Sequence, residues 1–180
     1  TPLTKKGRLR LLTKIKLGQL VSAENRRERT NALLDTYRNE ASKELRVTHI
    51  DRIMEKIICS LLYWCEGAKN PVGGVRFTNS DPKLIRTFLV LFRRSFTVDE
   101  NRIRIGLHLH EYHDVKKQTA FWSGIAAVDK NKFIRPYLKP HTGKRIRKDY
   151  PGCAQVRYHD NNIARQLLIT AEVFLQKMGV

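Results

Sequence analysis

The chain has no long apolar run and no signal-peptide pattern. No stretch of about 18 or more apolar residues occurs, so the sequence offers no segment that could cross a membrane. The N-terminus also lacks the order of basic, apolar and small residues that marks a secretory signal. We therefore expect neither membrane insertion nor export, and we predict a cytoplasmic protein.

Cysteine is scarce as well. The three cysteines, Cys59, Cys65 and Cys153, form no CxxC pair, which argues against a disulfide framework and a structural zinc site. Cys59 and Cys65 lie within an apolar helical pattern, where a free thiol behaves as a small hydrophobic group. We interpret all three as reduced core residues.

Acidic residues are few relative to basic ones. The 180 residues include 35 Lys and Arg against 17 Asp and Glu, a formal net charge of +18. Such an excess is the electrostatic footprint of a nucleic-acid binder. Because 41% of the residues are hydrophobic, the chain can still bury a core, and it should not be read as a disordered basic tail.

Residues 1–48 form a basic segment of their own. They contain 12 Lys and Arg and 5 Asp and Glu, and the segment is predicted to be helical. It has no long apolar stripe except around Leu9, Leu12, Ile15, Leu17 and Leu20, so the helix is expected to be thinly anchored. The segment suits an arm along a phosphate backbone, and it equally suits a solvated basic helix without a partner.

Residues 49–180 alternate between helical and extended patterns. Apolar residues at i, i+4 and i+8 predict a helix from Ile53 that Gly67 ends. Strict alternation predicts a strand at 102–110, aliphatic on one face and basic on the other. Further strands are expected at 75–79 and 153–158, and further helices after the capping residues Asp81, Asp114 and Asp160. Strands with one polar face favour an α+β fold, with a mixed or antiparallel sheet and helices on one face.

The first of these helices ends in Glu66 followed by Gly67. The last turn of a helix carries a partial negative charge, so a carboxylate there is disfavoured unless a cation lies beside it. A divalent metal would supply that cation, and a metal next to a polyanion suggests phosphodiester chemistry. The plain alternative is a surface glutamate that happens to precede a capping glycine.

The outward positions of the three predicted strands are almost all hydrogen-bond donors, and none is acidic. Arginine pairs with guanine edges and glutamine with adenine in a major groove, while other cations contact phosphates. The alternative is an ordinary solvated strand face, which would mix acids with bases. The positions are Arg76, Thr78, Arg102, Arg104, His108, His110, Gln155, Arg157 and His159.

Several of these motifs together resemble the LAGLIDADG family of homing endonucleases and its uncharacterised bacterial members. They are the segments at 63–67, 78–81, 108–114 and 139–145, and the resemblance covers about residues 45–180. The order of elements also fits. Relatives often carry a helix-turn-helix module before this region, which leaves room for such a module ahead of Thr1.

The resemblance implies a LAGLIDADG-like domain at 49–180 with a basic, saddle-shaped sheet that lies on double-stranded DNA. It also implies that Glu66 binds Mg²⁺, with Gly67 bringing its carbonyl close, and that one motif per chain makes a homodimer. Leu61 stands where the family usually has a glycine that allows close helix contact. The expected activity is Mg²⁺-dependent cleavage of both DNA strands. Because some relatives bind DNA without cutting, a sequence-specific regulator is the alternative.

Other basic and histidine residues are secondary candidates. Lys69 and Lys139 could steady a developing phosphorane charge. The basic loop at 139–148 adds three candidate DNA contacts, Lys144, Arg145 and Arg147. An RNA-binding module is a third hypothesis, although RNA recognition would call for exposed aromatics on the sheet. Tyr137, Phe121 and Trp122 are instead predicted to lie in the core and at its rim.

The histidines at 108, 110 and 113, with Glu111 and Asp114, could bind zinc. The interpretation we prefer places His108 and His110 on the DNA-contacting face, Glu111 and His113 in a turn, and Asp114 at a helix cap.

Overall fold

A computed structural model describes residues 4–140 and 149–179 of the chain. Contacts divide the chain into two compact units, Thr1–His49 and Ile50–Val180. The basic loop residues Lys144, Arg145 and Arg147 lie outside the described residues. Among the described residues, no helix is both long enough and apolar enough to span a membrane.

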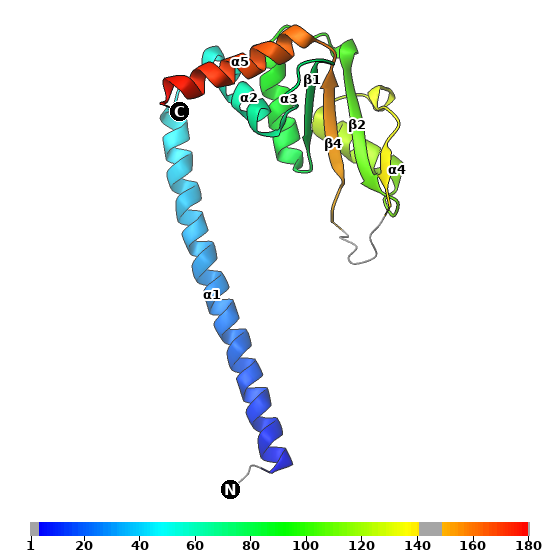
Figure 1. The fold of residues 1–180 in the computed structure, drawn as a ribbon. Coiled ribbons are helices and arrows are strands. Elements are labelled where there is room, and N and C mark those ends of the chain that lie inside the picture. The colour runs from blue at the N-terminus through cyan, green and yellow to red at the C-terminus, as the bar shows by residue number, and fades with distance from the viewer. Residues whose placement is uncertain (1–3, 141–148, 180) are drawn as a thin grey trace. The chain divides into compact units, whose positions relative to one another are not determined.

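The first unit consists of one long helix, α1 (Lys5–Val47) (Figure 1). Thr4 caps its start, because the Thr4 hydroxyl accepts a hydrogen bond from the Gly7 amide at 3.2 Å. The predicted helical segment is therefore confirmed. No residue of α1 is buried, and leucines such as Leu9 and Leu20 remain more than half exposed. Backbone hydrogen bonds hold this helix together without a hydrophobic core.

The second unit contains a four-stranded mixed sheet of β1 (Val75–Asn79), β2 (Ile103–His110), β3 (Tyr137–Lys139) and β4 (Cys153–Tyr158). The strand order is β1-β4-β2-β3. Strand β4 pairs antiparallel with both β1 and β2, whereas β2 and β3 are parallel. The α+β class and the mixed sheet are thus confirmed. The predicted strands at 75–79 and 153–158 match their observed bounds, and β3 is an addition.

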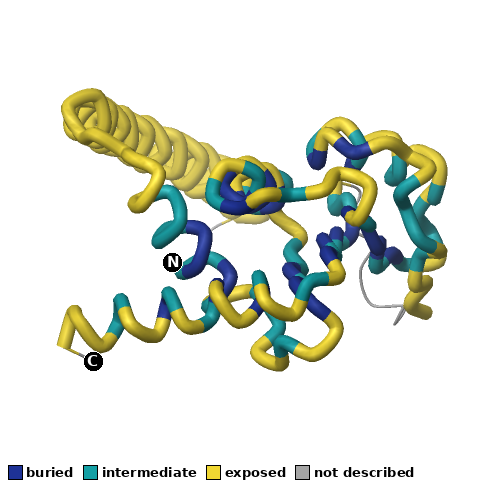
Figure 2. The backbone as a smooth tube through the Cα atoms, turned by 90° about the horizontal axis from the view of Figure 1, so that it is seen from above, coloured by how far each residue is buried: buried dark blue, intermediate teal, exposed yellow. Residues whose placement is uncertain are grey.

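Four helices pack against the apolar face of this sheet: α2 (Arg52–Glu66), α3 (Pro82–Ser95), α4 (Val115–Ala126) and α5 (Asn161–Lys177). Two short 3-10 turns, η1 (Glu100–Arg102) and η2 (Lys130–Lys132), complete the unit. Figure 2 shows the buried positions in dark blue on the strands and on the sides of the helices that face them. Aromatic rings fill the core between sheet and helices; the Phe77 and Phe88 rings stack at 4.0 Å.

Aspartates begin the helices of the second unit. The side chains of Asp81, Asp114 and Asp160 accept hydrogen bonds from backbone amides of the first turn, as predicted. Asp51 caps α2 in the same way. These carboxylates satisfy backbone donors that would otherwise lack partners, so they are committed to structure rather than to chemistry.

Candidate nucleic-acid interface

The face of the sheet opposite the core carries the polar side chains in aligned rows. Arg157 on β4 lies between Arg76 on β1 and Arg104 on β2. Gln155 likewise lies between Thr78 and Gly106. We call this surface the polar face. The strand register therefore places the Cα atoms of three arginines within about 10 Å, since neighbouring strands are separated by roughly 4.8 Å.

A hydrogen-bond chain links the side chains of the polar face across β4. The Arg157 Nε donates to the Gln155 Oε1 at 2.5 Å, and the Gln155 Nε2 donates to the Thr78 hydroxyl at 2.9 Å. These bonds fix the Gln155 amide between its neighbours. The terminal nitrogens of Arg157 make no hydrogen bond to other described residues, so they are available to an anion or a base edge.

Arg102 does not belong to the polar face. It ends η1, and β2 begins only at Ile103. Its guanidinium lies 4.8 Å from the Tyr158 ring, which belongs to the core face, and pairs with Asp160 at 3.5 Å. It also donates a hydrogen bond to the His159 carbonyl. The alternating pattern assigned Arg102 to the strand, but these three contacts hold it at the strand's end.

His108 lies on the polar face between Cys153 on β4 and Tyr137 on β3. The Tyr137 ring meets the His108 ring edge to face at 5.8 Å. Burial lowers the pKa of His108, and the positive charges of Lys139 and Arg157 lower this pKa further. The imidazole is therefore neutral at pH 7 in the free protein.

Tyr137 lies outside the core. Its side chain is 59% exposed on β3, whereas Trp122 is fully buried and donates from its indole nitrogen to the Pro151 carbonyl at 2.9 Å. Phe121, at 41% exposed, lies at the rim. The polar face thus offers one exposed ring beside its histidine.

The histidine-rich turn after β2 shows no sign of a zinc site. The His113 Nδ1 accepts from the His110 amide at 2.9 Å, and its Nε2 lies 2.8 Å from the Tyr150 carbonyl. Both ring nitrogens are therefore engaged. No group of three potential ligands was found within 4–140 and 149–179. Asp114 caps α4, and 111–113 form a turn, as the preferred interpretation predicted.

Glu66 lies at the β1 edge of the polar face. After α2 ends, Gly67 pairs with Phe77 of β1, and the Ala68 amide donates to the Arg76 carbonyl at 2.9 Å. This short antiparallel pairing brings the helix end to the sheet. A pocket of about 420 Å³ results, and its lining combines the acid with cations and amides: Glu66, Gly67, Ala68, Lys69, Asn70, Arg76, Thr78 and Gln155.

Glu66 is exposed and forms no ion pair with any described residue, although Lys69 and Arg76 share its pocket. The Lys69 ammonium instead lies 4.6 Å from the centre of the Trp64 ring. The Arg76 Nε is buried without a hydrogen-bond partner among the described residues, and its Nη2 donates to the Val72 carbonyl at 3.1 Å. The pocket therefore offers one free carboxylate and donors not fully used by the protein.

Lys139 is not brought to Glu66. It lies on β3, three strand spacings or about 14 Å from β1. The two residues cannot act on one phosphate within a single protomer. Lys139 instead sits beside His110 at the opposite edge of the sheet.

Position 67 must be glycine because Tyr63 lies too close to leave room for a side chain. An added Cβ would lie 2.4 Å from the Tyr63 ring and 2.5 Å from its carbonyl oxygen, whose bond from the Gly67 amide ends α2. Gly67→Ala should therefore destabilise the fold by about 1–3 kcal/mol, measured by urea unfolding. Gly124→Ala is the matched control, because an added Cβ there meets nothing within 4 Å and alanine favours helix α4. Equal stability of the two variants would contradict this account of Gly67.

The outer side of α2 was missed by the sequence analysis. Cys59 and Tyr63 are buried on the inner side, but Ile53 is 71% exposed, and Leu61 and Trp64 are only partly buried. The spacing of Ile53, Ile57, Leu61 and Trp64, three or four residues apart, was the signal that could have separated two apolar sides. We call these four residues the outer stripe.

No known family model, curated protein or solved structure matches this chain at a significant level.

Proposed function

We propose that this protein binds double-stranded DNA through the polar face and, as a homodimer, cleaves it in a Mg²⁺-dependent reaction at Glu66. The observation that carries the proposal is the pocket in which Glu66 meets Arg76, Thr78 and Gln155. A lone carboxylate at the edge of a cationic, acid-free surface fits a metal held against a nucleic-acid phosphate.

DNA is the partner best matched by the polar face. Arg76, Arg104 and Arg157 form one row, and Lys139 extends the positive charge to the far edge. Guanidinium groups reach both phosphates and guanine edges, and Gln155 adds an amide for base reading. One exposed ring, Tyr137, is too little for the stacking surface that single-stranded RNA recognition uses.

The residues present fit Mg²⁺ in a shared site. Mg²⁺ commonly takes one or two carboxylates and completes its shell with waters and substrate phosphates. Each protomer would offer the Glu66 carboxylate and the Gly67 carbonyl, and the DNA would offer phosphate oxygens. The bound ion supplies a divalent charge beside the scissile phosphate and acidifies a water. Lys69 and Arg76 add positive charge in the same pocket.

The outer stripe of α2 is the surface that would form the homodimer. A monomer leaves Ile53 exposed and the other three residues of the stripe only partly buried, on the helix that ends in Glu66. Pairing of two such helices would bury the stripe and bring a second carboxylate toward the first. Leu61 would take part in this contact where the family usually has a glycine, with the Trp64 side chain near the same contact.

A non-cleaving, sequence-specific regulator is the second candidate. It is favoured by the finding that no three-ligand group exists within the described ranges 4–140 and 149–179. The same polar face would bind DNA, and Glu66 would then contribute no chemistry. The two functions separate in one experiment, in which the full chain is incubated with supercoiled plasmid and target-library DNA in Mg²⁺ or EDTA. Mg²⁺-dependent cutting supports the nuclease; tight binding in both buffers without cutting supports the regulator.

DNA binding should depend on pH through His108. A phosphate above the polar face favours the charged imidazolium, so binding takes up a proton at a group that is neutral in the free protein. Affinity should rise as the pH falls from 8 to 6, by at most about tenfold per pH unit. Fluorescence anisotropy with His108→Gln should show a smaller rise, and the exposed His49→Gln should match the native chain. A native-like pH profile for His108→Gln would refute this role.

A further inference from the structure

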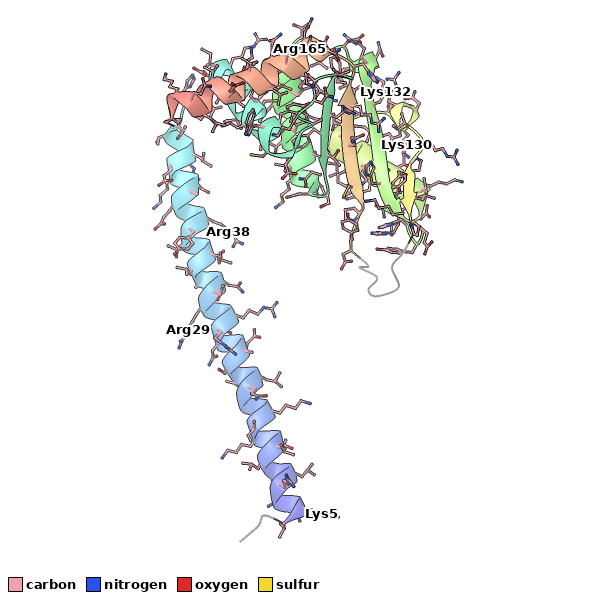
Figure 3. The ribbon with its side chains drawn as sticks, viewed as in Figure 1. Lys5, Arg29, Arg38, Lys130, Lys132 and Arg165 are labelled. Atoms are coloured by element: carbon pink, nitrogen blue, oxygen red, sulfur yellow. The ribbon has the colours of Figure 1, made fainter. Side chains whose placement is uncertain are left out.

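The positive charge of α1 is confined to one half of the helix. Residues 5–29 contain nine Lys and Arg and two Glu, whereas residues 30–47 contain three of each sign. The six cations at 5–16 have no acid among them. Figure 3 shows side chains such as Arg29 and Arg38 extending outward from the helix. The charge is therefore presented to solvent along a limited stretch.

These cations are not neutralised within the helix. In the described part of α1, the one ion pair joins Arg38 to Asp35 at 2.5 Å, in the balanced half. The first turn holds Lys5 and Lys6 and no acid, although the start of a helix already carries a partial positive charge. The basic half therefore carries an electrostatic cost that an anionic partner would relieve.

The arrangement of charge selects the kind of anion. At about 100° per residue, the cations at 5–16 spread over roughly two thirds of the circumference, and Leu9 and Leu12 fall among them. A helix that lies on a membrane needs a separate apolar face, which this pattern does not provide. A DNA duplex carries phosphates on both walls of each groove and can contact cations on several sides of a helix. Residues 5–29 span about 37 Å, close to one turn of B-DNA.

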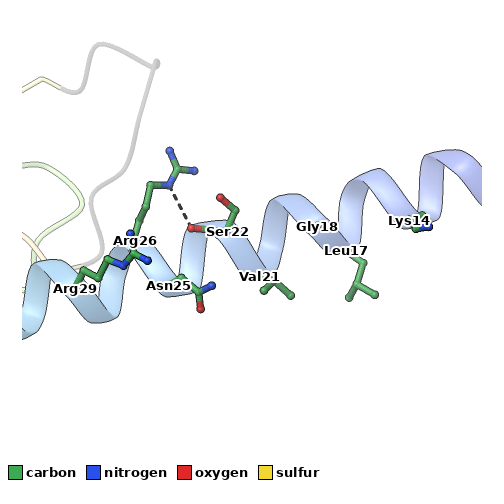
Figure 4. Close-up of a pocket in the computed structure, with 8 residues that line it drawn as sticks. All are labelled: Lys14, Leu17, Gly18, Val21, Ser22, Asn25, Arg26 and Arg29. Atoms are coloured by element: carbon green, nitrogen blue, oxygen red, sulfur yellow. Dashed lines mark hydrogen bonds between the residues drawn. The ribbon is translucent and has the colours of Figure 1, made fainter.

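A notch lies within this basic half. Gly18 leaves a shallow depression of about 520 Å³ on the helix surface, with Lys14 at one end and Arg26 and Arg29 at the other (Figure 4). The Arg26 Nε donates to the Ser22 carbonyl at 3.3 Å, which directs its guanidinium along the helix. An added Cβ at Gly18 would meet nothing within 4 Å, so a phosphate backbone can approach closely here.

We propose that residues 5–29 of α1 form a basic arm that binds the phosphates of duplex DNA without reading sequence. The proposal rests on the proposed function in that DNA is the partner of both surfaces. The arm would add affinity and raise the encounter rate, while the polar face would supply base contacts.

The test compares two variants of the full chain that each lose three positive charges. The arm variant carries Lys14→Gln, Arg26→Gln and Arg29→Gln, and the control carries Arg38→Gln, Lys43→Gln and Arg46→Gln in the balanced half. Binding to a fluorescent duplex of unrelated sequence is measured by anisotropy between 50 and 200 mM salt. The arm variant should lower the slope of log affinity against log salt by about 2–3 and weaken binding at 150 mM about tenfold. The control should lower the slope by less than about 1.

Each other outcome overturns the arm. Circular dichroism must show equal helicity in both variants. Equal helicity is expected because glutamine is a good helix former. If the arm variant is helical and its salt slope is unchanged, the proposal is wrong. Loss of binding to phosphatidylserine vesicles or to structured RNA, but not to duplex DNA, would assign the arm to that partner instead. Failure of the proposed function can be distinguished from failure of the arm. If the chain never cleaves DNA but the arm variant still lowers the salt slope, only the nuclease proposal fails. If the chain cleaves DNA but the arm variant leaves the salt slope unchanged, only the arm proposal fails.

Discussion

Replacing Glu66 with glutamine is expected to abolish Mg²⁺-dependent cleavage, with a loss of at least about 100-fold. Glutamine keeps the size of the side chain and its helix propensity but removes the negative charge that would hold the cation. Glu66 is exposed and lies outside the core, so the fold should be unaffected. Plasmid cleavage followed over time in Mg²⁺ measures the effect.

The matched control is Glu172→Gln on α5. Glu172 is also exposed and also lines a pocket with Lys69, but that pocket lies by Trp64 and Leu168 rather than on the polar face. Its replacement should leave cleavage unchanged. Equal cleavage by Glu66→Gln and the native chain would remove Glu66 from the chemistry.

DNA affinity in EDTA provides a second readout for Glu66→Gln. Removing a negative charge from a pocket shared with Lys69 and Arg76 should leave metal-free binding unchanged or slightly tighter. A variant that binds but does not cut would separate recognition from cleavage. If the native chain cuts no duplex substrate with any divalent metal, the nuclease proposal fails and the regulator remains.

Leu61→Glu is expected to weaken the homodimer by at least about 100-fold. Pairing through the outer stripe would bury this side chain, and burying an unpaired carboxylate costs several kcal/mol. Sedimentation equilibrium over a range of protein concentrations measures the dissociation constant. Val90→Glu is the control, because Val90 is an exposed apolar residue on α3, outside the outer stripe.

Cys65 supplies an independent measure of the same contact. Its thiol is exposed in the last turn of α2, next to Glu66, whereas Cys59 is buried. In a Cys153→Ser background, a short bifunctional maleimide should link two chains through Cys65, and Leu61→Glu should prevent the link. A native chain that sediments as a monomer at all concentrations would exclude the dimer.

The helices and most strands could be predicted from the sequence because their ends are local. Asp81, Asp114 and Asp160 act on amides two or three residues away, so their capping role is readable without tertiary information. Strand β3 could not be predicted, since three residues are too few for an alternating pattern and its parallel pairing with β2 is a long-range contact. Cys65 was expected in the core but is exposed, because α2 buries only one of its two apolar sides.

The residues of the candidate site could be predicted from the sequence, but which of them lie together in space could not. Alternation placed Arg76, Arg104 and Arg157 outward, and the sheet aligns them in one row. Glu66 lies beside this row because Gly67 pairs with Phe77. Lys139 lies away from Glu66 because the strand order places β3 at the opposite edge of the sheet. Both are tertiary pairings, which the local pattern of a single sequence does not specify.

The row of three guanidinium groups has a thermodynamic consequence for the free protein. Like charges held side by side repel one another, and dissolved ions screen that repulsion within about 10 Å at 0.1 M. The second unit should therefore become more stable against unfolding as ionic strength rises, whereas the proposed binding to DNA should become weaker. The same electrolyte thus acts in opposite directions on conformational stability and on complex formation.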